Sequence, residues 1–193
     1  MRMLLIGPPG SGKGTQATVI AKHFGISHIS SGELLRRHIA DQTAVGRVAA
    51  EYVGRGDLVP DGIVMDILRK PVEAASRNGG YVLDGFPRTV AQAESAYLVA
   101  KDLGARVQVA LCLDVPRDQL IDRLLHRAHT DGRDDDTEEV MRHRIEVFEK
   151  LTAPLLDYYA GREILVRVDG ARPIGEVSAA AIAELERVRP ELS

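Results

Sequence analysis

The sequence predicts an α/β fold in which helices cover both faces of a five-stranded parallel sheet. The chain has 193 residues, enough for one domain with a full hydrophobic core. Five short apolar runs alternate with segments of helical spacing, which is the pattern of buried parallel strands joined by helices. A glycine-rich segment follows the first run, at the carboxyl edge where such sheets bind ligands.

Strands are expected where apolar residues run without a helical period and end at glycine, serine or aspartate, at residues 3–6, 26–30, 81–83, 107–113 and 164–168. Helices are expected at residues 16–24, 33–40, 44–53, 61–68, 89–103, 117–127, 137–159 and 174–188. We expect Asp61 to cap the fourth helix and Pro71 to bend or restart it. Pro154 should bend the helix over 137–159. The bond between Phe86 and Pro87 is expected to be cis, because an aromatic residue before proline favours a tight turn.

The composition excludes several classes of protein. Hydrophobic residues make up 45% and the net charge is −3, which argues against disorder and against a general attraction to nucleic acid. No apolar run approaches the roughly 18 residues of a membrane span, and residues 4–6 are too short for a signal-peptide core. Cys112 is the only cysteine, so an internal disulfide or multi-cysteine zinc site is excluded, and we expect it in the core. A soluble, cytoplasmic protein is expected.

Residues 7–15 have the composition of a phosphate-binding loop between a strand and a helix. Glycines let backbone N–H groups converge on an anion at the helix N-terminus, and a lysine adds a mobile positive charge. We assign this role to Gly10, Ser11, Gly12, Lys13, Gly14 and Thr15. In the common form of the loop a hydroxyl residue directly follows the lysine and ligates Mg²⁺. Here Gly14 intervenes, so we expect Mg²⁺ to be held through phosphates and water rather than by a direct protein ligand.

A second phosphate site is predicted after the strand over 81–83. Asp84 lies at the carboxyl end of that strand, where it can orient a magnesium-bound water. Arg88 follows four residues later, close enough to bind the same phosphates. Both residue types suit a reaction at phosphate.

Together these segments resemble the adenylate kinases of bacterial type. The resemblance rests on residues 7–16, 29–36, 56–59 and 83–88 with Gln92, and on Asp122, Arg123, Arg127, 132–135, Arg144, 152–154, 158–159 and 168–170. It runs from end to end with the motifs in family order. It implies the P-loop nucleoside monophosphate kinase fold and the reversible transfer of a phosphoryl group from Mg-ATP to AMP, giving two ADP.

The resemblance also implies the roles of individual residues. ATP is expected at the loop residues above and at Arg123, Arg127 and Arg172. AMP is expected at Ser31, Arg36, Asp57, Leu58, Val59, Gly85, Phe86, Pro87, Arg88, Gln92, Arg133 and Arg144. The catalytic group comprises Lys13, Asp84, Arg88, Arg123, Arg133 and Arg144. No general base is needed, because the attacking AMP phosphate already carries an anionic oxygen, and arginines suit the charge on the moving group.

Residues 30–59 and 126–136 fit the alternation poorly and look like insertions. The resemblance implies an AMP-binding insertion at 30–59, a short lid without zinc at 126–136, and a core of 1–29, 60–125 and 137–193. A monomer is expected. The main alternative is a pyrimidine nucleoside monophosphate kinase, since a few base contacts such as Gln92 and Ser31 decide the acceptor. A non-catalytic nucleotide switch is more remote, because a switch has no use for a second phosphate-binding cluster.

Overall fold

Five parallel strands form the central sheet, and their carboxyl ends share one edge. The computed structural model describes residues 1–102, 105–131 and 137–188, with only the backbone for 102 and 126–131. The strands are β1 (Arg2–Ile6), β2 (Ser27–Ser30), β3 (Tyr81–Asp84), β4 (Val109–Asp114) and β5 (Leu165–Asp169). Their order is β2-β3-β1-β4-β5, and every neighbouring pair is parallel. The predicted five-stranded parallel sheet is therefore confirmed.

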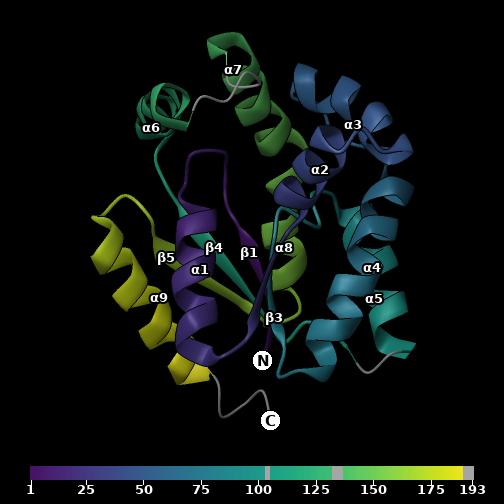
Figure 1. Ribbon diagram of the computed structural model, residues 1–193. Coiled ribbons are helices and arrows are strands. Elements are labelled where there is room, and N and C mark those ends of the chain that lie inside the picture. Colours follow the sequence, from purple (N-terminus) through teal and green to yellow (C-terminus); the bar gives the residue numbers. More distant parts are fainter. Residues whose placement is uncertain (103–104, 132–136, 189–193) are drawn as a thin grey trace.

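Each face of the sheet packs against its own helices. One face carries α1 (Lys13–Phe24) and α9 (Ile174–Val188), and the other carries α4 (Asp61–Arg77), α5 (Val90–Asp102) and α8 (Pro154–Ala160) (Figure 1). Successive residues of a strand point to opposite faces. Met3 and Leu5 of β1 therefore pack in the hydrophobic cluster under α1 and α9, while Leu4 and Ile6 pack in the cluster under α4, α5 and α8. All four are nearly fully buried, and each contributes about 1.5–3 kcal/mol to folding.

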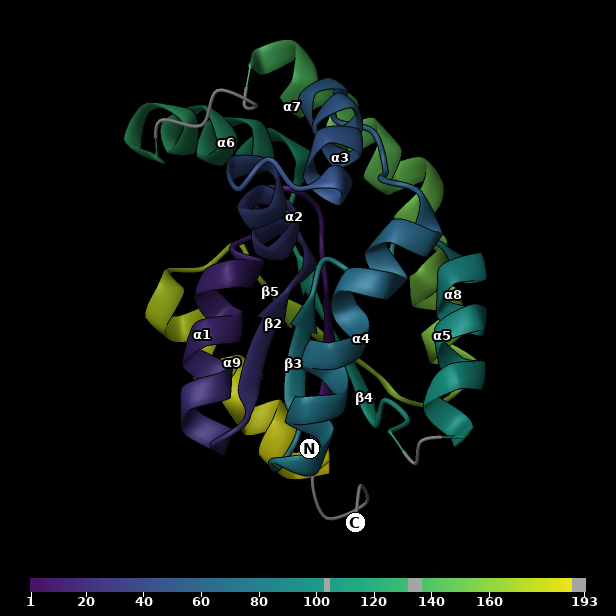
Figure 2. The ribbon, with the colours of Figure 1, turned by 45° about the vertical axis from the view of Figure 1, so that its right-hand side comes forward.

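Four more helices stand over the edge at which the strands end. These are α2 (Ser31–Ala40), α3 (Ala44–Arg55), α6 (Arg117–Asp131) and α7 (Glu138–Val147), seen in both views (Figures 1 and 2). The helices α2 and α3 pack against each other. Leu120 and Leu124 of α6 pack with Met141 and Ile145 of α7 in a small third cluster. The chain thus places side chains from both helix pairs above the sheet.

Two helices differ from their predicted extent, while the bends expected at Pro71 and Pro154 stay predictions. The helix α4 continues through Pro71 to Arg77 without a break. Proline removes one backbone hydrogen bond, but Leu68 before it and Ala75 after it pack into the same cluster, and burial of both halves offsets that loss. The single helix expected over 137–159 is instead α7, a π-helical turn (Phe148–Thr152) and α8. Pro154 begins α8, where its missing N–H is not required.

Smaller differences concern the ends of elements. The helix α6 extends to Asp131, beyond the expected end at residue 127. Pro60, not Asp61, occupies the N-cap of α4. The cis bond between Phe86 and Pro87 is confirmed, as is the burial of Cys112. Within the described ranges, no helix is long and apolar enough to cross a membrane.

Candidate active site

A cavity of about 600 Å³ opens at the carboxyl ends of β1 and β3 and extends beneath the helices above them. Most of the residues predicted to bind nucleotide line it. They are Gly10, Gly12, Lys13, Gly14, Thr15, Ser31, Arg36, Asp57, Leu58, Val59, Asp84, Gly85, Phe86, Pro87, Arg88, Gln92, Arg123 and Arg144. Residues far apart in the sequence therefore face a single space, of the size typical for small-molecule sites.

The phosphate loop forms one wall of the cavity. Gly10 has a φ of 82°, and a methyl group there would meet the carbonyl oxygen of Leu120 at 2.9 Å, so only glycine fits. The helix α1 begins directly after the loop, at Lys13, and its N-terminus favours an anion. The Lys13 ammonium donates to the carbonyl oxygens of Gly7 at 2.8 Å and Pro8 at 2.9 Å. These bonds hold the Lys13 ammonium beside the loop.

A cluster of arginines lies around the end of β3. The Arg88 Nε donates to the Gly85 carbonyl at 2.8 Å. Arg88 is exposed by surface area where it lines the cavity, while protein atoms crowd its guanidinium. This partial loss of hydration lowers the pKa of Arg88, Asp84 opposes the change, and the nearby charges of Arg144 and Arg36 lower the pKa further. Three guanidinium groups close enough to repel one another make a site that an anion stabilises.

Two further groups meet at this cluster. A methyl group on Gly85 would lie 2.5 Å from the Ser31 hydroxyl oxygen and 3.3 Å from the Arg88 Nη2, so these groups converge on the glycine. Ser31 is buried. The Asp84 side chain is 9% exposed, and its buried Oδ1 has no hydrogen-bond partner within the described structure. Such an atom needs a donor when the site is filled.

The backbone of Arg88 is fixed from two sides. Its N–H donates to the Gln92 side-chain Oε1 at 2.7 Å, and its carbonyl accepts from the Thr152 hydroxyl at 2.8 Å. The Gln92 Nε2 in turn donates to Asp61 Oδ1 at 2.6 Å. The positions of Arg88 and Gln92 are thus set by contacts to α4 and to the π-helical turn.

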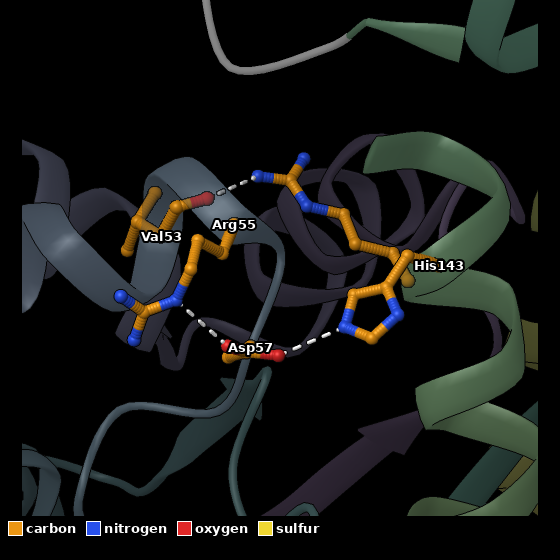
Figure 3. Close-up of polar contacts among 5 residues, drawn as sticks. Val53, Arg55, Asp57 and His143 are labelled. Atoms are coloured by element: carbon orange, nitrogen blue, oxygen red, sulfur yellow. Dashed lines mark hydrogen bonds and ion pairs between the residues drawn. The ribbon is translucent and has the colours of Figure 1, made fainter. Parts of the chain in front are cut away.

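Contacts from α7 hold the segment that follows α3, as Figure 3 shows. Asp57 Oδ1 lies 2.8 Å from the His143 Nε2, and Asp57 Oδ2 accepts from the Arg55 Nε at 3.1 Å. The His143 contact and then the Arg55 contact lower the pKa of the exposed Asp57 carboxyl. The Arg144 Nη2 also donates to the Val53 carbonyl at 3.3 Å. The α3 end and α7 therefore meet along one seam beside the cavity.

Arg123 of α6 is tied to the loop after β5. Its Nη1 donates to the Gly170 carbonyl at 2.9 Å and its Nη2 to the Ala171 carbonyl at 3.1 Å. These two bonds fix the guanidinium of Arg123, a partly buried residue that also lines the cavity.

Some predicted residues lie elsewhere. Ser11 is 3% exposed and does not line the cavity. Arg172 is exposed, its Nε donates to Asp169 Oδ2 at 3.1 Å, and it does not line the cavity either. Arg133 and the side chain of Arg127 lie outside the described residues.

The sequence reasoning missed three residues that support the site, namely Asp61, His143 and Thr152. Each acts through a partner 31 to 86 positions away, a distance that local spacing does not reveal. Thr152 belongs to a family motif, which was a usable signal. Among the described residues, no group of three or more His, Cys, Asp or Glu is placed to hold a metal ion.

Comparisons with known proteins agree with this geometry. The family model described as adenylate kinase matches residues 5–164. The adenylate kinase of Kocuria rhizophila is 46% identical over 186 residues, which cover 96% of this chain and 99% of the relative. The adenylate kinases of Nocardia farcinica and Trichodesmium erythraeum are 42% and 38% identical, each over 97% of this chain and at least 99% of the relative. With a phosphate loop and an arginine cluster on one cavity and relatives matched along nearly its full length, this chain belongs to the adenylate kinase family.

Proposed function

We propose that this protein transfers a phosphoryl group reversibly from Mg-ATP to AMP, giving two ADP. The observation that carries the proposal is that the phosphate loop and the arginine cluster line one cavity. Phosphoryl transfer needs two phosphate chains held in line and stabilisation of the charge that moves between them. A protein that only binds one nucleotide would need the loop alone.

On the donor side, the loop residues bind the ATP phosphates. The Lys13 ammonium exchanges the Gly7 and Pro8 carbonyls for phosphate oxygens, which are stronger acceptors because they are charged. Arg123, already fixed on Gly170 and Ala171, adds positive charge near the transferred group. Arg127, Arg133 and Arg172 stay predicted ATP or transition-state contacts.

On the acceptor side, Arg36, Arg88 and the Ser31 hydroxyl bind the AMP phosphate. Residues 57–59 approach the nucleotide from the end of α3, and Gln92 binds the adenine edge. The AMP phosphate oxygen attacks the terminal phosphorus of ATP, the bond to the bridging oxygen breaks, and ADP leaves. Arg88 and Arg144 stabilise the charge that develops on the moving group.

The site also suits the magnesium ion that accompanies ATP. The Asp84 Oδ1 has no hydrogen-bond partner among the described residues, and a metal-bound water would supply a donor. A metal held through water also suits Gly14 at the position where a hydroxyl ligand is usual. The ion would neutralise charge on the phosphates.

We further propose that residues 30–59 form the AMP-binding insertion and residues 126–136 a short lid, both closing over the core of 1–29, 60–125 and 137–193. Closure would exclude water and prevent loss of the phosphoryl group to hydrolysis. A cytoplasmic monomer with no nucleic-acid or membrane partner stays a prediction.

A coupled assay for ADP with ATP and a panel of AMP, UMP and CMP tests the proposal. We expect ADP formation that depends on AMP and very slow hydrolysis of ATP alone. A preference for UMP or CMP would make the protein a pyrimidine nucleotide kinase instead. Rapid hydrolysis without any acceptor would contradict closure, and no transfer to any monophosphate would contradict the proposed reaction.

A further inference from the structure

Both the oxygen and the nitrogen of the Gln92 side-chain amide are held by hydrogen bonds. Gln92 is 3% exposed, lies in the first turn of α5 and lines the cavity. Its Oε1 accepts from the Arg88 backbone N–H at 2.7 Å, and its Nε2 donates to Asp61 Oδ1 at 2.6 Å. The Gln92 backbone N–H donates to the Thr89 hydroxyl at 3.1 Å. Neither the backbone nor the side chain is therefore loosely placed.

These partners fix which end of the amide is oxygen and which is nitrogen. A backbone N–H can only donate, and an aspartate carboxylate can only accept. Turning the amide over would set the –NH₂ against the Arg88 N–H and the Oε1 against the Asp61 carboxylate. Both hydrogen bonds would be lost and both contacts would become repulsive. One orientation is thus strongly favoured before any nucleotide enters.

The Oε1 and the Nε2 of the fixed amide can each make one more hydrogen bond. The Nε2 carries a second hydrogen and the Oε1 a second lone pair. A base that fits both must place an acceptor at the Nε2 and a donor at the Oε1. Adenine has this pattern in its ring N1 and its 6-amino group. Hypoxanthine, which has the same shape, reverses the pattern with a ring N1–H and a 6-oxo group.

We propose that Asp61 is a positioning residue that makes the acceptor site select 6-amino over 6-oxo purine monophosphates, by holding the Gln92 amide in this orientation. Asp61 does not line the cavity, and its described contact toward the site is the one to the Gln92 Nε2. The proposal rests on the proposed function, since it assumes that Gln92 faces the base of the acceptor nucleotide.

The test compares AMP with IMP, its 6-oxo counterpart, as acceptors for the full-length protein. A site that hydrogen-bonds its substrate rejects an analogue with mismatched groups by large factors, so we expect wild type to prefer AMP by at least about 1,000-fold in kcat/KM. Asp61→Asn keeps the size of the side chain and can either accept or donate. It should leave kcat/KM for AMP within about threefold, while the AMP-to-IMP ratio falls about 10- to 100-fold, as the loss of one charge-assisted bond predicts.

Asp61→Ala provides a second variant. It should lower the AMP-to-IMP ratio as Asp61→Asn does, but should also lower kcat/KM for AMP, because Gln92 then loses a partner in its productive orientation. Asp66→Asn is the matched control, with the same charge change at an exposed position of the same helix; it should change neither value. In a Gln92→Ala background, Asp61→Asn should have no further effect on the ratio.

An unchanged ratio in a folded Asp61→Asn protein would overturn the proposal. An equal loss with both acceptors would also overturn it, because that result indicates a structural role for Asp61. Wild type that uses AMP and IMP equally would refute the selection while leaving the proposed reaction intact. Wild type that uses neither would instead contradict the proposed function.

Discussion

Replacing Arg88 with alanine removes the guanidinium at the centre of the arginine cluster while leaving the backbone in place. The backbone N–H still donates to Gln92 and the carbonyl still accepts from Thr152. Among the contacts of the described residues, the side-chain hydrogen bond lost is the one from Nε to the Gly85 carbonyl, which costs about 1 kcal/mol of stability. A change in activity then reports on the missing charge rather than on a collapsed site.

The expected size of that change follows from the electrostatics of the cavity. A preorganised donor aimed at developing charge in a partly water-excluded site contributes about 3–4 kcal/mol to the transition state. At 1.36 kcal/mol per factor of ten, kcat/KM for AMP should fall about 100- to 1,000-fold. Arg88→Lys restores the charge without the planar fork, so we expect an intermediate loss of about 10- to 100-fold.

The measurement is steady-state ADP formation with AMP varied at saturating ATP, with thermal unfolding to confirm the fold. Arg117→Ala is the control, because Arg117 pairs with Glu149 at 2.7 Å and does not line the cavity. It should change kcat/KM by less than about twofold. A loss below tenfold in folded Arg88→Ala, or a comparable loss in Arg117→Ala, would show that the Arg88 guanidinium does not stabilise the transferred charge.

Three other predictions test separate parts of the structure. Lys13→Met should lower kcat at least about 100-fold while calorimetry still detects AMP binding; normal turnover would be incompatible with a phosphate role. Leu124→Ala should lower the free energy of unfolding by about 2–5 kcal/mol, because Leu124 is fully buried and its side chain backs the Gly10 loop, whereas Leu98→Ala, at a 64% exposed position, should cost little in urea unfolding. Burial, with the charge and hydrogen bond of Asp114, raises the pKa of Cys112 to about 12 from an ordinary 9.0. The thiolate at pH 8 is then about a thousandfold scarcer, so Cys112 should react with a disulfide reagent only in unfolded protein; equal rates in native protein and in urea would contradict this.

The sequence predicted the sheet because the three central strands β1, β3 and β4 are short, mostly apolar runs that are buried on both faces. Helix starts and ends were predicted well where local signals act, as at Gly25 after α1. Pro71 shows the limit of local rules, because a tertiary cluster holding both halves of α4 outweighs one missing hydrogen bond. The π-helical turn before Pro154 likewise has no local signature in the chain.

The residues of the candidate site likewise fall into those that local sequence predicts and those that only the fold brings together. The phosphate loop and the Asp84–Arg88 segment are contiguous in the sequence, so their residue types were enough to predict a phosphate site. Asp61, Thr152 and His143 act through partners brought close only by the fold. Arg172 pairs with Asp169 and does not line the cavity, so its ATP contact stays a prediction.

The proposed reaction requires two nucleotide sites that meet in one cavity. Calorimetric titration with two adenosines joined by five phosphates tests it most directly, because this compound can occupy both sites at once. Linking the two ligands should give one compound bound per chain, with a Kd at least about 100-fold below that of ATP, and Arg88→Ala should weaken it. Binding no tighter than that of ATP alone would contradict the claim.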